Sequence, residues 1–237
     1  MHRFYSETGF LSPEDAHHAL SVLRLSVGDE VELISAGNRF RAVIESVSSG
    51  AVKLSSGEML PSTEPGISVT LFQGLPKGDK MEWIIQKAVE LGVTRIVPVE
   101  LSRCVVRLNE KSRMSKTERW QKIAREAGKQ SGRCVIPAVL PPVSLNNLPD
   151  LFSGLDAVVV PWEECSSGGP LSFSRNHPDL SSLGILIGPE GGIDPEEIRF
   201  LLQAGAVPVT LGRRILRTET AGIAAISALF GLYGEME

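Results

Sequence analysis

The segment GPEGG at 188–192 stands between a predicted strand and a predicted helix, and this order constrains the fold more than any other feature of the chain. The preceding run LGILI at 183–187 is too short for a helix and rich in β-forming residues, which indicates a buried strand. Asp194, Pro195 and Glu197 then follow in the order of a helix N-terminus with a capping box. A strand, a glycine-rich turn and a helix place backbone N–H groups at the ligand-binding edge of an open α/β sheet.

The middle of this turn carries a carboxylate, which limits the kind of ligand that the turn suits. Glu190 would repel a phosphate, so a neutral or cationic ligand fits better. Glycine content by itself leaves open the alternative that GPEGG is only a tight turn.

Composition is that of a soluble globular protein, with 42% hydrophobic and 22% charged residues among 237. No apolar run has the length of a membrane span, and the N-terminus lacks the hydrophobic region of a signal peptide. We therefore expect a cytoplasmic protein that does not associate with a membrane. The three cysteines are widely spaced and odd in number, which predicts neither a disulfide framework nor a metal site.

Two domains are expected, at 1–68 and 69–237, joined within a Pro- and Ser-containing segment at 58–66. The first has a helix entry at 12–15 and then short strands, at 30–34, 39–47 and 51–54. In the second, strands alternate with helices, which predicts a mostly parallel sheet. The strands are expected at 69–71, 95–99, 157–160, 184–187 and 207–211, and the helices at 79–91, 115–130, 195–204 and 221–233.

Residues 103–133 hold ten Lys or Arg and three Glu, a net charge of +7 in a chain whose overall charge is −4. Ser115 and Glu118 have the spacing of a capping box, and the helix that they would start has one apolar and one basic face. Such a local patch is typical of a nucleic-acid contact. The alternative is a solvated basic face.

A second loop, LGRRILRTETA at 211–221, also leaves a predicted strand and enters a helix, so we expect both loops to meet at one crevice. Arg213, Arg214 and Arg217 would give that crevice a cationic rim, although each alone is ordinary surface charge. The helix at 221–233 is apolar nearly all round, which favours burial of both faces and a subunit interface.

These motifs together resemble one known family. PKGDKMEWIIQKAVELGV at 76–93, ERWQKIAREAGKQSGR at 118–133, IGPEGGIDPEEI at 187–198 and LGRRILRTETA at 211–221 are similar to the SPOUT-class methyltransferases that modify N3 of uracil in small-subunit (16S) ribosomal RNA. The resemblance runs from Met1 almost to the C-terminus. It implies a PUA-like, RNA-binding β-barrel at 1–68, a SAM-binding α/β domain with a trefoil knot at 69–237, and a homodimer.

Carried onto this sequence, the resemblance implies a set of S-adenosylmethionine (SAM) and RNA contacts. The SAM pocket would use Trp162, Ile187, Gly188, Glu190, Gly191, Gly192, Leu211, Gly212, Ile215, Leu216 and Arg217, with Pro161 and Glu163 as a third wall. The RNA contacts would be Arg3, Arg24, Lys122, Arg125, Lys129 and Arg133. The acidic balance of residues 1–68, five basic against nine acidic, departs from what a strong RNA grip needs.

Methylation of N3 requires the imide proton to leave and the resulting anion to be stabilised. We expect Arg217 to stabilise this charge and Glu219 to accept the proton or orient Arg217; the alternative for Glu219 is a simple ion pair near a helix N-terminus. The partner is then ribosomal RNA in the small subunit or its assembly intermediate. Two other functions stay open, a SPOUT methyltransferase acting on another base or ribose, and a non-catalytic RNA-binding factor of the ribosome.

Overall fold

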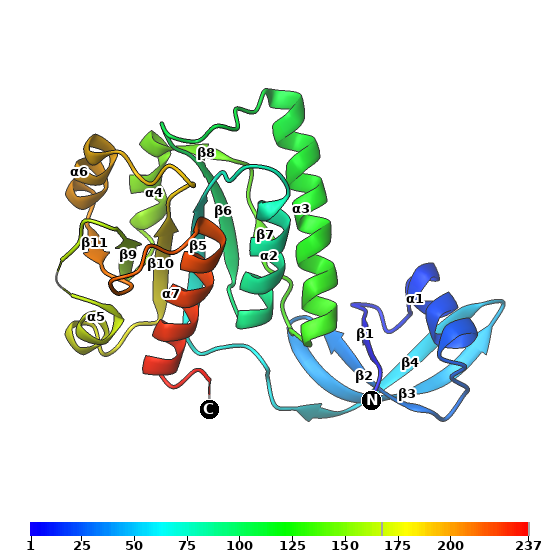
Figure 1. The fold of residues 1–237 in the computed structure, drawn as a ribbon. Helices are drawn as coiled ribbons and strands as arrows, with labels where there is room; N and C mark the ends of the chain where they lie inside the picture. Colours follow the sequence, from blue (N-terminus) through cyan, green and yellow to red (C-terminus); the bar gives the residue numbers. More distant parts are fainter. Residues whose placement is uncertain (167, 237) are drawn as a thin grey trace. The chain divides into compact units, whose positions relative to one another are not determined.

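A computed structural model describes residues 1–166 and 168–236 of the chain (Figure 1). It divides into two compact units. The first contains residues 1–64 together with 129–135, and the second contains residues 65–128 and the chain from 136 onward. The segment expected to link two domains at 58–66 is partly a strand, because the strand Ala51–Leu60 extends into it.

The first unit is built on a four-stranded sheet with the order β1-β2-β3-β4. Its strands are β1 (Arg3–Tyr5), β2 (Glu30–Ser35), β3 (Asn38–Ser48) and β4 (Ala51–Leu60). β1 runs parallel to β2, and the other pairs are antiparallel. Ala36 and Gly37 both have positive φ (47° and 74°), as do Ser49 and Gly50 (49° and 82°), so tight turns join these strands.

The α-helix α1 (Pro13–His17) continues into the π-helical turn η1 (His18–Val22), and both pack on this sheet through Ala16 and Ala19. Ser12 caps α1, as its spacing predicts, by accepting a hydrogen bond from the Asp15 amide. The apolar residues of β2, β3 and β4 that face the helix complete a small separate core.

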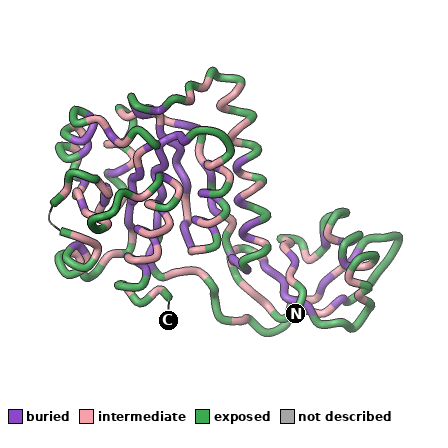
Figure 2. Tube along the Cα trace, in the orientation of Figure 1, coloured by how far each residue is buried: buried purple, intermediate pink, exposed green. Residues whose placement is uncertain are grey.

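The second unit is a seven-stranded, all-parallel sheet, which confirms the predicted α/β class. The strands are β5 (Ser68–Gly74), β6 (Arg95–Glu100), β7 (Ala138–Val139), β8 (Val143–Ser144), β9 (Ala157–Pro161), β10 (Ser182–Ile187) and β11 (Ala206–Val209). Their order is β11-β9-β10-β5-β6-β7, with β8 also paired to β6. The central strands are buried on both faces (Figure 2), as parallel strands covered by helices must be.

Helices cover this sheet and connect its strands (Figure 1). They are α2 (Lys80–Leu91), α3 (Glu110–Ser131), the 3-10 turn η2 (Leu145–Asn147), α4 (Leu148–Phe152), α5 (Pro170–Asn176), α6 (Pro195–Gln203) and α7 (Thr218–Leu232). Asp194 and Glu197 form the predicted capping box of α6, and Gly92 ends α2 in a left-handed conformation with φ 112°. α7 packs against α2 and against β10.

Two predicted helix starts are wrong. α3 begins at Glu110, and the Asn109 side chain accepts a hydrogen bond from the Ser112 amide, so Asn109 takes the capping role assigned to Ser115. Ser115 lies inside the helix and its hydroxyl donates to the Ser112 carbonyl. α7 begins at Thr218 rather than at 221, so part of the LRTET motif forms its first turn.

No helix within the described residues is both long enough and apolar enough to span a bilayer.

Candidate functional site

A cavity of about 750 Å³ lies in the second unit where three parallel strands end. β9, β10 and β11 are neighbours in the sheet, so the loops that follow them start side by side. Residues 162–166 follow β9, residues 188–193 follow β10, and residues 210–217 follow β11; all three loops contribute to the cavity wall. The loops at 188–192 and 211–217 therefore meet at one cavity, as predicted.

The glycines of the first loop permit close packing that a side chain would prevent. A Cβ on Gly192, whose φ is +72°, would lie 2.6 Å from Oε1 of Glu163 in the neighbouring loop. A Cβ on Gly188 would lie 2.8 Å from the Ile193 side chain. At the end of β5, a Cβ on Gly74 would lie 2.7 Å from the Pro189 nitrogen. The GPEGG turn thus packs tightly on its own chain while its other side faces the cavity.

A buried hydrogen-bond chain joins the first loop to the start of α7. The Thr218 hydroxyl donates to the Gly188 carbonyl at 2.6 Å and accepts from Nε2 of Gln73 at 2.9 Å. Gln73 is completely buried at the end of β5, and its Nε2 also donates to the Gly74 carbonyl. Thr218 therefore ties the loop that precedes it to the GPEGG turn.

A cluster of three charges links both loops to the start of α2. Nζ of Lys80 lies 3.1 Å from Oε1 of Glu190 and 3.1 Å from Oε2 of Glu219. Glu190 also accepts the Lys77 amide at 3.1 Å, which fixes its carboxylate. Because one ammonium serves two carboxylates, the cluster carries one net negative charge, and Glu190 is partly neutralised rather than free.

The pKa values follow from these contacts. The hydrogen bond to Glu190, then that to Glu219, raises the pKa of Lys80 above its ordinary value. Burial opposes ionisation of Glu190 and Glu219, but hydrogen bonds from backbone amides and from Lys80 outweigh it and lower the pKa of both carboxyls. All three groups are therefore charged at neutral pH.

Most of the residues that the sequence analysis assigns to SAM binding line this cavity. Those that line it are Trp162, Ile187, Gly188, Glu190, Gly192, Leu211, Gly212, Ile215, Leu216 and Arg217, together with Pro161 and Glu163. Gly191 is absent from this wall, because its Cβ position faces Arg103, 3.1 Å from the Arg103 Cβ. Glu219 is also outside the wall and contacts Lys80, so the ion pair considered as its alternative role is present.

Sequence reasoning missed Lys80 and Thr218, which line the cavity, and the buried Gln73 behind it. Lys80 ends the segment PKGDK and begins α2, and Thr218 lies in the LRTET motif, so each residue belongs to a segment that the sequence singles out. Nothing in the pattern showed that they converge, because Lys80 is 110 positions before Glu190.

The basic run at 103–133 is more neutralised than its composition suggests. Five of its cations form ion pairs with carboxylates outside the run, which leaves it a net charge of +2; these pairs are Arg103–Asp194, Arg113–Glu100, Arg119–Glu82, Lys129–Asp15 and Arg133–Glu64. Lys122 and Arg125 are exposed, as an RNA contact requires. Arg24 is exposed, whereas Arg3 is half-buried and donates to Glu32 at 2.8 Å.

Arg133 was expected to contact RNA, but its surroundings differ from that expectation. Its side chain is only 4% exposed, because Nε and Nη2 both donate to the Glu64 carboxylate, at 2.9 Å and 2.6 Å. The same carboxylate accepts the Cys134 amide. The Arg133 guanidinium is therefore buried and paired inside the first unit, which does not support its proposed contact with RNA.

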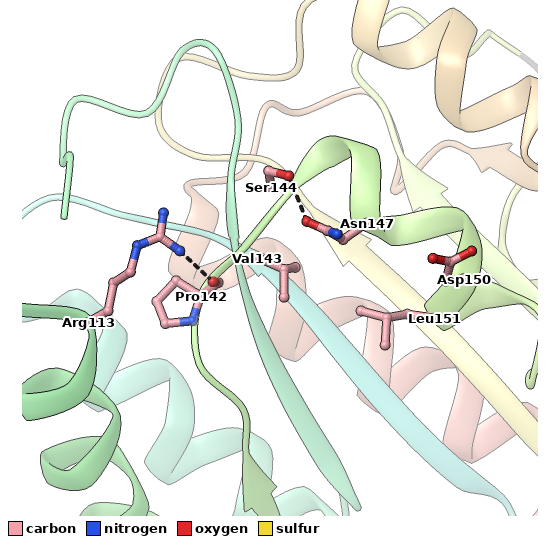
Figure 3. Close-up of a pocket in the computed structure, with 7 residues that line it drawn as sticks. All are labelled: Arg113, Pro142, Val143, Ser144, Asn147, Asp150 and Leu151. Atoms are coloured by element: carbon pink, nitrogen blue, oxygen red, sulfur yellow. Dashed lines mark hydrogen bonds between the residues drawn. The ribbon is translucent and has the colours of Figure 1, made fainter. Parts of the chain in front are cut away.

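A second hollow, of about 490 Å³, lies beside β8 and α4 (Figure 3). Arg113 borders it and donates to the Pro142 carbonyl at 2.7 Å, while Ser144 donates to Asn147. These contacts are internal to the wall. The hollow contains none of the residues proposed for SAM or RNA.

Comparison with known proteins identifies the family. A family model described as an RNA methyltransferase domain matches residues 63–230, and one described as an RNA methyltransferase PUA domain matches residues 11–55. The ribosomal RNA small subunit methyltransferase E of Bacillus subtilis (strain 168) is 40% identical over 225 residues, which cover 92% of this chain and 88% of that protein.

Solved structures agree. The ribosomal RNA small subunit methyltransferase E from Neisseria gonorrhoeae, bound to S-adenosyl methionine, is 32% identical, with a TM-score of 0.84 over 98% of each chain. A methyltransferase from Legionella pneumophila in complex with SAM is 33% identical, with a TM-score of 0.80 over 97% of this chain and 96% of that one. The resemblance seen in the sequence motifs is thereby confirmed, and the chain belongs to the family of ribosomal RNA small subunit methyltransferase E.

Proposed function

We propose that this protein is a SAM-dependent methyltransferase that modifies N3 of a specific uridine in the 16S ribosomal RNA of the small subunit. The observation that carries the proposal is the cavity formed by the GPEGG and LGRRILRT loops at the ends of adjacent parallel strands. Its volume of about 750 Å³ lies within the range of small-molecule sites, roughly 300 to 1,000 Å³.

The cavity wall fits SAM chemically. Ile187, Leu211 and Leu216 provide apolar area for an adenosine group. Glu163 and Glu190 line the cavity, and Lys80 neutralises only part of their charge, so the wall suits a ligand with a sulfonium and an ammonium rather than a phosphate. When bound, SAM supplies an electrophilic methyl group on a cationic sulfur.

Two side chains beside the cavity are proposed for the acceptor. Arg217 occupies the N-cap position of α7 without a capping hydrogen bond from its side chain, is exposed and lines the cavity, so its guanidinium is available to stabilise the negative charge that develops on the uracil ring. Glu219 is held ionised by its contacts, and an ionised carboxylate is able to accept the N3 proton.

RNA binding is proposed for the exposed cations Arg24, Lys122 and Arg125, with Arg3 and Lys129 in supporting positions. The first unit, residues 1–64 with 129–135, is proposed as the PUA-like RNA-binding domain. Ribosomal RNA in the small subunit, or its assembly intermediate, is the proposed partner, and a cytoplasmic location is proposed with it. No metal takes part in this proposal.

A homodimer is proposed through α7. Gly222, Ala225, Ile226 and Phe230 are buried within one chain, but Ile223, Ala224, Ser227 and Ala228 are only half-buried and Leu232 is exposed. These small and apolar residues form a face that a second copy of the helix can cover. Light scattering measures the mass in solution, and a monomer that binds SAM fully would contradict this assembly.

The test is methyl transfer to defined RNA. Small subunits from cells that lack this enzyme are incubated with the protein and isotopically labelled SAM, and the labelled nucleoside is identified after digestion. We expect one N3-methyluridine per subunit. Label on ribose or on another base would support a different RNA methyltransferase, and SAM binding without any transfer would support a non-catalytic factor.

A further inference from the structure

The loop after β11 carries three arginines and no acidic residue between Thr210 and Thr218. Arg213 and Arg214 are both exposed, and both line the cavity at its edge. Within residues 1–166 and 168–236, neither of these side chains forms an ion pair or a hydrogen bond. Half of the cations in the 103–133 run, in contrast, are paired with carboxylates.

Ile215 follows these arginines and is 87% exposed, more than any other large hydrophobic residue among those described. A lone exposed apolar side chain needs no explanation, but one that directly follows two unpaired arginines in a cavity wall is a different case. Arginine contacts phosphate through charge and a planar fork of donors, while an apolar side chain packs on a sugar or a base.

From this arrangement, and resting on the proposed function, we infer that Arg213 and Arg214 bind RNA phosphates that flank the target uridine, and that Ile215 packs against the neighbouring nucleotide. The methyl acceptor has to reach the cavity, so the RNA backbone on either side of it passes over the cavity edge. This loop supplies Arg213, Arg214 and Arg217 to the cavity wall, whereas Lys80, the other cation in that wall, is paired with Glu190. The loop thereby serves the RNA and the cavity at the same time.

The experiment measures binding of unmethylated small subunits as a function of monovalent salt at fixed magnesium. The test variant combines Arg213→Ala with Arg214→Ala. Each lost phosphate contact lowers the slope of log affinity against log salt by about 1, so we expect a decrease of about 2 and a roughly tenfold or greater loss of affinity at low salt. Affinity for SAM should change less than threefold if the arginines act on RNA rather than on the cavity.

Two variants separate charge from shape. Arg213→Lys with Arg214→Lys keeps both positive charges and should keep the wild-type salt slope. Ile215→Ser should weaken binding severalfold while leaving the slope unchanged, because an apolar contact releases no counterions.

The matched control removes two cations elsewhere in the same unit, Lys87→Ala with Arg199→Ala. Both pair with glutamates of their own helices, Glu90 and Glu196, and neither lines the cavity. This control should retain the wild-type slope. If the arginine variant also retains it, or if its only effect is a change in the mass measured by light scattering, the loop contacts a second copy of the chain or solvent and the inference is wrong. If wild-type protein itself neither binds nor methylates the subunit, the proposed function fails instead.

Discussion

Nζ of Lys80 lies 3.1 Å from Oε2 of Glu219, and this contact joins the first turn of α2 to the first turn of α7. The same ammonium reaches Glu190 in the GPEGG turn. Lys80 therefore positions both cavity loops although it belongs to neither. Without it, two carboxylates would face each other with no cation between them, and each would resist ionisation.

Replacing Lys80 by Met should raise the pKa of Glu219. A carboxyl whose pKa is lowered on folding stabilises the fold above its ordinary pKa of 4.5, and this stabilisation is lost as pH falls. The free energy of unfolding of Lys80→Met should therefore depend less on pH in the acid range than that of the wild type. If Glu219 accepts the N3 proton, the acid limb of kcat should also move to higher pH. SAM affinity, measured by calorimetry, should fall on the order of tenfold.

Lys80→Arg should restore part of the SAM affinity, since it retains the charge. Lys87→Met is the control, because Lys87 pairs with Glu90 at 2.8 Å on the same helix and does not line the cavity. Equal SAM affinities and acid dependences for wild type and Lys80→Met would show that the cluster has no positioning role.

Replacing Thr218 by Val should destabilise the second unit. The side chain keeps its shape but leaves the Gly188 carbonyl and one Gln73 amide proton without their partner, which costs about 1 to 3 kcal/mol. Urea denaturation measures this loss. Thr117→Val, which removes one hydroxyl bond to the Arg113 carbonyl within α3, should change the unfolding free energy by only about 0.5 kcal/mol. Similar losses in both variants would contradict the special role of Thr218.

Replacing Arg133 by Met should destabilise the first unit by about 3 kcal/mol, because Glu64 is then left largely buried without its cation. Arg41→Met removes an exposed cation from the same unit and should cost about 0.5 kcal/mol or less. Chemical denaturation measures the loss of unfolding free energy, and hydrogen exchange shows whether that loss occurs in the first unit. A stable Arg133→Met protein with weakened RNA binding would restore the original assignment of Arg133 to RNA.

Asp156 is a second group that should make the stability of the fold depend on pH in the acid range. It accepts hydrogen bonds from the Ser181 hydroxyl and from the Ser181 and Ser182 amides, which lower its pKa from 3.8 to about 2. The folded pKa lies below the unfolded one, so the stabilisation is present above pH 3.8 and is lost as pH falls from 3.8 to about 2. The stability difference between wild type and Asp156→Asn should shrink across this window. A constant difference would contradict the assignment.

Local patterns predicted most of the elements and both cavity loops. The capping box at Asp194 and the apolar run of β10 are short-range signals, and the structure confirms both elements. The start of α3 was missed because the Asn109 cap precedes a turn without apolar residues, where periodicity gives no signal. The buried pair Arg133–Glu64 was missed because its partners are 69 positions apart.

The convergence of Lys80, Glu190 and Glu219 escaped prediction for the same reason, since a sequence states spacing along the chain and not distance in space. The trefoil knot stays a prediction of the family resemblance, because strand order and pairing do not report how a loop is threaded.

Calorimetry with Ala221→Leu measures whether SAM occupies the cavity between the GPEGG and LGRRILRT loops. Ala221 lines the cavity from α7, and three added carbons would occupy ligand space without the backbone strain of a glycine replacement. Thr220→Leu, on the neighbouring exposed position outside the cavity wall, is the control. We predict SAM binding to wild type and to Thr220→Leu, and at least roughly tenfold weaker binding to a folded Ala221→Leu. Equal affinity in all three proteins would mean that SAM does not occupy this cavity.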